Sequence, residues 1–132
     1  MFKSIALAGA IFMAATGMAL AQSNCSEPIP PAAPPSKPNL NQISDASHDA
    51  NQFMKQSDDY QECLKRDLRQ KQAKAAKDKK EIDPSIADSI QAQIDQNQRQ
   101  KEQVGTEFQT ALMTFCKSNP TGDPSCKKIL GQ

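Results

Sequence analysis

Two long runs of helix-forming residues, separated by a single Asp-Pro step, most constrain what this chain can fold into. The first run contains no glycine or proline and consists mostly of good helix formers such as Gln, Lys, Ala, Arg and Glu. Asp83 and Pro84 follow it and suit the N-cap and the first turn of a second helix. The sequence therefore predicts an all-α protein, with helices at about 41–81 and 84–117.

Both runs carry apolar or small residues at the alternating three and four spacing of an amphipathic helix. In the first run these are Ile43, Ala46, Ala50, Phe53, Tyr60, Leu64 and Leu68. In the second run they are Ile86, Ile90, Ile94, Val104, Phe108, Leu112 and Phe115. Because the connection is short, the two runs predict a long antiparallel helical hairpin over 41–118, with its tip at Asp83-Pro84.

The segments on either side of the hairpin have a different composition. Residues 22–40 form a proline-rich leader, and from Pro28 to Pro38 each proline fixes its φ angle and lacks an amide donor. Extended polyproline II is the conformation that such a run favours. Residues 119–132 contain Asn-Pro and Thr-Gly-Asp-Pro turn signals, which predict a short C-terminal loop.

The first 21 residues have the pattern of a cleavable secretory signal: Lys3, an apolar run over 5–15 and the small-residue triplet Ala19-Leu20-Ala21. Cleavage would leave a mature chain that starts at Gln22 and is periplasmic or secreted. An uncleaved membrane anchor is the competing interpretation, but the run is rich in Ala and Gly rather than Leu. A lipoprotein modified at Cys25 is disfavoured because no small apolar run directly precedes that cysteine.

Export would allow the four cysteines to form disulfides, for which three pairings exist. With the tip near Asp83, Cys63 lies opposite about Gln103, and Cys116 is then displaced along the axis by roughly 20 Å. This distance is far beyond disulfide reach, so Cys63 with Cys116 is disfavoured.

The favoured pattern joins Cys25 to Cys63 and Cys116 to Cys126. The leader is long enough to return antiparallel along the first helix, with its prolines near Tyr60 and Phe53. The rival pattern, Cys25 with Cys116 and Cys63 with Cys126, remains open at this point.

The apolar stripes are thin, so a two-helix layer should be marginally stable without disulfides or self-association. Asn97 and Lys101 interrupt the stripe of the second helix. This interruption motivates the hypothesis that the hairpin forms a homo-oligomer to hide its remaining apolar surface.

Charge is balanced overall but uneven along the chain. Of the 16 Lys and Arg residues, cleavage removes Lys3, which leaves 15 against 15 Asp and Glu. The segment 65–80 is strongly basic, and it could bind an anionic membrane surface, lipopolysaccharide or an acidic envelope protein. The candidate partner-binding residues are Lys71, Lys74, Lys77, Lys79 and Lys80.

Two observations weaken a binding role for this segment. Its bases are dispersed around the helix rather than opposed by large apolar residues. Charges one helical turn apart can form ion pairs on a solvated face. The pairs would be Glu62–Arg66, Asp67–Lys71 and Lys74–Asp78. Nucleic acid is disfavoured as a partner because the segment offers no aromatic residues for base stacking.

The sequence predicts no catalytic, cofactor-binding or metal-binding residue. His48 with Asp45 and Asp49 could bind a divalent metal weakly, but a structural site needs a fuller ligand set. No Cys-x-x-Cys spacing indicates redox catalysis, and no nucleophile-elbow motif accompanies the sole histidine.

Three stretches resemble a group of small uncharacterised exported bacterial α-helical proteins. They are Ser-Asp-Asp-Tyr-Gln-Glu-Cys-Leu at 57–64, Asp83-Pro84, and Asn-Gln-Arg-Gln-Lys-Glu-Gln-Val-Gly at 97–105. The resemblance implies an exported helical protein with a recurring cysteine after the tyrosine, and it implies no established activity.

Together these patterns predict a non-enzymatic exported interaction or envelope-structural protein. The alternative is a small holdase-like periplasmic chaperone, in which flexible helical arms and a basic hairpin tip engage unfolded clients. An enzyme is the third and least supported possibility.

Overall fold

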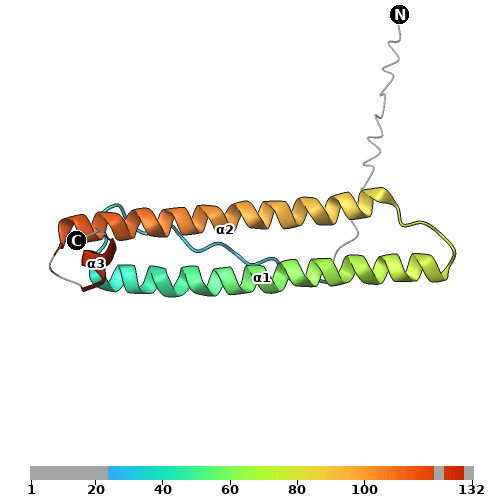
Figure 1. The fold of residues 1–132 in the computed structure, drawn as a ribbon, viewed down its shortest axis with the longest axis horizontal. Coiled ribbons are helices and arrows are strands. Elements are labelled where there is room, and N and C mark those ends of the chain that lie inside the picture. Colours follow the sequence, from blue (N-terminus) through green and yellow to red (C-terminus); the bar gives the residue numbers. More distant parts are fainter. Residues whose placement is uncertain (1–23, 121–123, 130–132) are drawn as a thin grey trace, which may run out of the picture.

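The protein is a long helical hairpin in a computed structural model that describes residues 24–120 and 124–129. Helix α1 (Leu40–Lys77) and helix α2 (Pro84–Ser118) lie antiparallel, and a short helix α3 (Pro124–Ile129) packs at the end opposite the tip (Figure 1). The predicted all-α hairpin is confirmed. The predicted signal at 1–21 lies outside the described residues.

A capping box begins α1. The Asn39 side chain accepts a hydrogen bond from the Gln42 backbone N–H, and the Gln42 side chain accepts one from the Asn39 backbone N–H, both at 2.9 Å. These reciprocal bonds satisfy two amide donors that a helix start otherwise leaves without partners. The leader therefore ends, and α1 begins, at a point that local chemistry defines.

The prediction that α1 continues to about residue 81 is wrong, because the helix ends at Lys77. The Lys80 N–H donates to the Ala75 carbonyl at 2.9 Å, and the Lys79 N–H donates to the Ala76 carbonyl at 3.1 Å. This is the Schellman arrangement, with Lys79 in the left-handed conformation at φ 53°. A lysine thus occupies the position that glycine usually fills.

The predicted start of α2 is confirmed, since the Asp83 side chain caps the helix and Pro84 occupies its first turn. The helix ends one residue later than predicted, at Ser118, where the Asn119 N–H bonds back to carbonyls of the last turn. Helix α3 was not predicted, because six residues in a turn-rich tail carry too little periodic pattern to indicate a helix.

The core consists of three apolar clusters spaced along the hairpin. The cluster at the end opposite the tip is formed by Ile43, Ala111, Phe115, Cys116 and Cys126. The middle cluster is formed by Ala50, Phe53 and Val104. The cluster nearest the tip is formed by Tyr60, Leu64 and Ile90, with Cys25 packed against it. Each cluster joins residues of both long helices, so the periodic stripes found in the sequence do form the interface.

A buried polar layer separates the middle cluster from the one nearest the tip. Asn97 and Ser57 are both fully buried, and the Asn97 side-chain amide donates to the Ser57 hydroxyl at 3.1 Å. The Asn97 carbonyl oxygen accepts a bond from the Gln61 side chain at 2.9 Å. Beside this layer, the Lys101 ammonium pairs with the Asp58 carboxylate. The polar residues that interrupt the apolar stripe, Asn97 and Lys101, therefore find their partners on α1 of the same hairpin. Self-association stays a prediction, but this interruption no longer supports it.

Asn97→Ala is expected to lower the free energy of unfolding by about 2 kcal/mol, because it leaves the buried Ser57 hydroxyl without its partner. The double variant Ser57→Ala, Asn97→Leu is expected to recover most of that loss, since both polar groups are then replaced. Urea unfolding followed by circular dichroism measures both. A double variant as unstable as Asn97→Ala would contradict this account of the layer.

The register of the hairpin differs from the one predicted. Leu64 packs against Ile90, so Cys63 lies near Ile90 rather than opposite Gln103. The prediction placed a tight turn at Asp83, whereas the chain leaves α1 at Lys77 and returns through a six-residue connection. This shift moves Cys63 still further from Cys116, so the argument against that pairing holds.

Helix α1 extends past the start of α2. Leu68 and Ile86 pack against the same cluster, and in antiparallel helices this places Pro84 opposite about residue 70. The last two turns or so of α1 therefore overhang α2, as Figure 1 shows at the end where the green and yellow segments meet. We call residues 71–83, which comprise this overhang and the connection, the tip.

The leader was predicted to lie along α1 alone. In the structure it lies in the groove between the two long helices. It runs antiparallel to α1 from the Cys25–Cys63 disulfide to Asn39 (Figure 1). Pro28 lies near Tyr60 as expected, but further along Pro31 lines one pocket together with residues of both helices, including Val104 of α2. An extended chain fits this groove because two parallel cylinders leave a concave channel along their line of contact.

Both favoured disulfides are present. Cys25 bonds to Cys63 with a Cα–Cα distance of 5.8 Å, and Cys116 bonds to Cys126 with a distance of 5.1 Å. The first fastens the leader to α1, and the second fastens α3 to the end of α2. Two disulfides are consistent with an oxidising compartment.

Candidate functional site at the hairpin tip

The tip lies beyond the last apolar cluster of the hairpin. Its side chains contribute nothing to the three clusters, and most of them are exposed, including the small Ala73 and Ala76 on the overhang. Because little is buried there, the tip adds little to stability. Its sequence is therefore free to serve another purpose.

Cationic side chains dominate α1 near the tip. Of the eight bases between residues 65 and 80, Lys65 and Lys71 form ion pairs within α1. The other six are exposed: Arg66, Arg69, Lys74, Lys77, Lys79 and Lys80. We call the four that lie within residues 71–83, which are Lys74, Lys77, Lys79 and Lys80, the basic tip. Of the five predicted partner-binding lysines, four belong to it, whereas Lys71 is half-buried and paired with Asp67.

The predicted ion pairs are present only in part. The Asp67–Lys71 pair is confirmed. Glu62 pairs with Lys65 at 3.0 Å rather than with Arg66, and Lys65 holds the pKa of the Glu62 carboxyl below its usual value, first through this hydrogen bond. Among the described residues no ion pair joins Lys74 to Asp78, which lies at the C-cap of α1 where the helical geometry ends.

Three carboxylates, listed at the end of this paragraph, lie on the connection between the helices. One of them, Asp83, accepts a hydrogen bond from the Ser85 backbone N–H at 2.9 Å, and this bond lowers the pKa of its carboxyl. Because Asp83 caps α2, its negative charge lies at the start of that helix and not on α1. The three are Asp78, Glu81 and Asp83.

Lys79 has a strained backbone within the basic tip. Its φ of 53° lies in the left-handed region, which costs a residue with a side chain about 1 kcal/mol relative to glycine. Backbone strain at an exposed residue indicates that its side chain has a function that a strain-free glycine would not supply. The side chain here is an ammonium group at the extreme end of the rod.

The described residues form no metal site around His48, where the sequence left weak binding of a divalent metal open. His48, Asp45 and Asp49 are exposed on α1, and within 24–120 and 124–129 no three metal-ligating side chains come together. The partly open pocket that Pro31 and Pro34 line between the leader and the helices measures about 20 Å³, which is room for about one water molecule. Two wider, more open hollows of about 470 and 390 Å³ also lie beside the leader. In the same part of the chain, no helix has the length and apolar character needed to cross a bilayer.

Sequence reasoning missed two features that the fold brings together. The Asn97–Ser57 contact joins residues 40 positions apart, and only the register of the hairpin reveals it. The leader prolines that face the groove are also a tertiary feature, although their spacing of three residues is readable in the sequence.

Comparisons with protein-family models, with curated proteins and with solved structures found no match to this chain.

Proposed function

We propose that the protein is a non-enzymatic exported interaction module, in which a braced hairpin presents the basic tip to an anionic surface of the cell envelope. The observation that carries the proposal is the overhang: α1 continues past its partner helix, and exposed cations cover its end. The two helices form a rod, along which the leader lies and to which the Cys25–Cys63 disulfide fastens it. This rod keeps the charged end at a distance from the rest of the protein.

The shape of the tip favours an anionic lipid surface over a protein partner. A specific protein interface buries about 800 Å² on each partner and is built around aromatic or Arg anchors in pockets. The blunt end of a single helix, with alanines between its cations, offers neither that area nor large apolar anchors. Attraction to a charged bilayer needs no pocket and contributes about 1 kcal/mol for each Lys or Arg near the surface.

Binding to vesicles tests this proposal. The tip variant replaces Lys74, Lys77, Lys79 and Lys80 with glutamine. The control variant replaces the exposed lysines Lys37, Lys55, Lys117 and Lys127 with glutamine, so both variants have the same net charge. Cosedimentation with vesicles of zwitterionic lipid, with and without about 30% anionic lipid, measures the partition coefficient.

The tip variant is expected to lose roughly a thousand-fold in partition coefficient at low salt, since four contributions of about 1 kcal/mol are removed. The control variant should stay within a few-fold of the native protein. Added salt should weaken native binding, because the contacts are exposed. Equal losses in the two variants, or native binding that does not depend on anionic lipid, would refute the proposal.

Lys79→Gly separates stability from binding at the tip. The variant is expected to raise the free energy of unfolding by about 1 kcal/mol, because glycine adopts the left-handed conformation without strain. It should at the same time lower vesicle binding by about five-fold through the loss of one cation. Urea unfolding and cosedimentation measure the two effects, and a stabilised variant with unchanged binding would show that Lys79 takes no part in docking.

A further inference from the structure

From Cys25 to Pro34 the leader faces the hairpin with every third residue, and Pro38, four residues after Pro34, is buried as well. Cys25, Pro28, Pro31 and Pro34 are each partly buried, whereas the residues between them are exposed. A polyproline II helix has three residues per turn, so this pattern means that one edge of such a helix lies along the groove. The edge has the spacing Pro-x-x-Pro-x-x-Pro.

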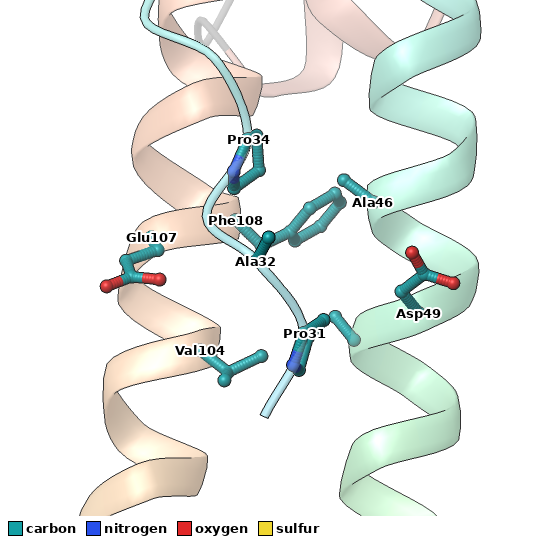
Figure 2. A pocket seen from close by; sticks show the side chains of 9 residues that line it. Pro31, Ala32, Pro34, Ala46, Asp49, Val104, Glu107 and Phe108 are labelled. Carbon is teal, nitrogen blue, oxygen red and sulfur yellow. The ribbon is translucent and has the colours of Figure 1, made fainter. Parts of the chain in front are cut away.

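Both long helices form the surface that receives these prolines. Pro28 lies beside Tyr60, close to the disulfide. Pro31 and Pro34 lie further along, among small and apolar side chains, with the carboxylates of Asp49 on α1 and Glu107 on α2 also lining the pocket (Figure 2). The small and apolar side chains are Ala46 and Ala50 of α1 and Val104 and Phe108 of α2.

Packing, and not hydrogen bonding, holds the leader in the groove. Between Cys25 and Pro38, no backbone or side-chain group of the leader forms a hydrogen bond with the described parts of α1 or α2. The gap on the side of the groove that Pro31 and Pro34 share measures about 20 Å³, whereas a wider, open hollow of about 390 Å³ lies between Pro34, Pro35 and α2. Recognition of proline-rich segments by apolar, aromatic-containing grooves has this character, because a polyproline II helix is ordered before it binds.

Position within the leader, and not proline content, decides which prolines are used. Pro30 and Pro35 directly neighbour Pro31 and Pro34 in the sequence, yet both are exposed. Ile29 is 88% exposed although it is the largest apolar side chain of the leader. The groove therefore selects a repeat of three and leaves the adjacent residues in solvent.

We propose that the groove between α1 and α2 is a recognition site for polyproline II segments with proline at every third position. The leader is its built-in occupant, and the same contacts accept a proline-rich peptide from another protein when the leader is displaced. The advantage of the leader is its attachment, which gives it a high effective concentration at the groove. This inference does not depend on the function proposed for the tip.

The first test compares two leader variants in a chain that keeps all its cysteines. Pro31→Ala, Pro34→Ala changes the groove-facing edge. Pro30→Ala, Pro35→Ala removes the same number of prolines from exposed positions and is the matched control. Equilibration in glutathione buffers, followed by alkylation and mass spectrometry of the Cys25 and Cys63 peptides, measures the effective concentration of this thiol pair.

The groove-facing variant is expected to lower that effective concentration at least ten-fold, because the docked edge brings Cys25 to Cys63. The control variant should change it less than two-fold. Equal changes in the two variants would overturn the proposal, since proline content alone would then explain the docking.

The second test asks whether the groove binds the segment as a separate peptide. The protein carries Cys25→Ser, Cys63→Ser, Pro31→Ala and Pro34→Ala, so that its own leader competes poorly. The probe is a fluorescent peptide with the sequence of residues 26–36, and fluorescence anisotropy measures its affinity up to about 1 mM, the usual range of effective concentrations for tethered segments.

The native peptide is expected to bind, and its Pro31→Ala, Pro34→Ala form at least ten-fold more weakly than its Pro30→Ala, Pro35→Ala form. No binding to a protein that keeps its helical circular dichroism, or equal affinity for the two altered peptides, would overturn the proposal. If the quadruple variant loses its helical signal, the first test decides. A larger change in the glutathione equilibrium for Pro31→Ala, Pro34→Ala than for Pro30→Ala, Pro35→Ala supports the proposal, and equal changes overturn it.

Discussion

Replacing Cys25 and Cys63 together with serine is expected to lower the free energy of unfolding by about 4 kcal/mol. The two cysteines are 38 residues apart, and in the chain-entropy description a cross-link that closes a loop of this length restricts the unfolded chain by about that amount. The total stability of a small protein is about 5–15 kcal/mol, so this loss is a large fraction of it. Urea unfolding followed by circular dichroism measures the loss.

The second disulfide provides the control for this prediction. Cys116 and Cys126 are 10 residues apart, and their replacement with serine should lower the free energy of unfolding by about 3 kcal/mol. The two variants act at opposite ends of the hairpin, so their effects should add in the fourfold variant. A first variant less destabilised than the second would contradict the view that the leader strap stabilises the hairpin.

Phe53→Ala is expected to lower the free energy of unfolding by about 4 kcal/mol. The Phe53 side chain is 2% exposed and packs with Ala50 and Val104 in the middle cluster, which has no other fully buried aromatic ring among the described residues. Small neighbours on α1 and a strap across the groove leave few side chains that could move into the cavity. Chemical unfolding in urea, with the slope compared to that of the native protein, measures the effect.

Ile29→Ala is the control for Phe53→Ala, because it also removes an apolar side chain but from a position that is 88% exposed. Its effect should lie within about 0.5 kcal/mol of zero. If Phe53→Ala were as mild as this control, the middle cluster would not be a packed core.

The helices themselves were predictable because their signals are local. Spacing of three and four residues, a run without glycine or proline, and the Asp83-Pro84 start each act within a few residues of the chain. The end of α1 was not predictable. Lys79 adopts the left-handed conformation that favours glycine, and no neighbouring residue in the sequence indicates that a helix ends there. That one local exception set the length of the connection and of the overhang on which the candidate site depends, whereas the overhang itself follows from the register of the two helices.

The candidate site was predictable as a set of residues but not as a surface. The cluster of lysines is plain in the sequence, yet the sequence treats Lys71 and Lys74 alike. In the structure Lys71 is paired with Asp67, whereas Lys74 is exposed. The difference arises because Asp67 lies one helical turn before Lys71, whereas Asp78, the predicted partner of Lys74, lies at the C-cap where α1 ends.

By itself the sequence determined that the protein is helical, that it is a hairpin, and which residues form the apolar stripes, because these properties follow from backbone preferences and short-range periodicity. Only the tertiary structure decided the register of the two helices, the partner of Asn97 and the place of the leader between both helices. Those properties depend on contacts between residues that are far apart in the chain. Many alternative registers satisfy the same local preferences, and the complete set of packed and hydrogen-bonded groups selects one of them.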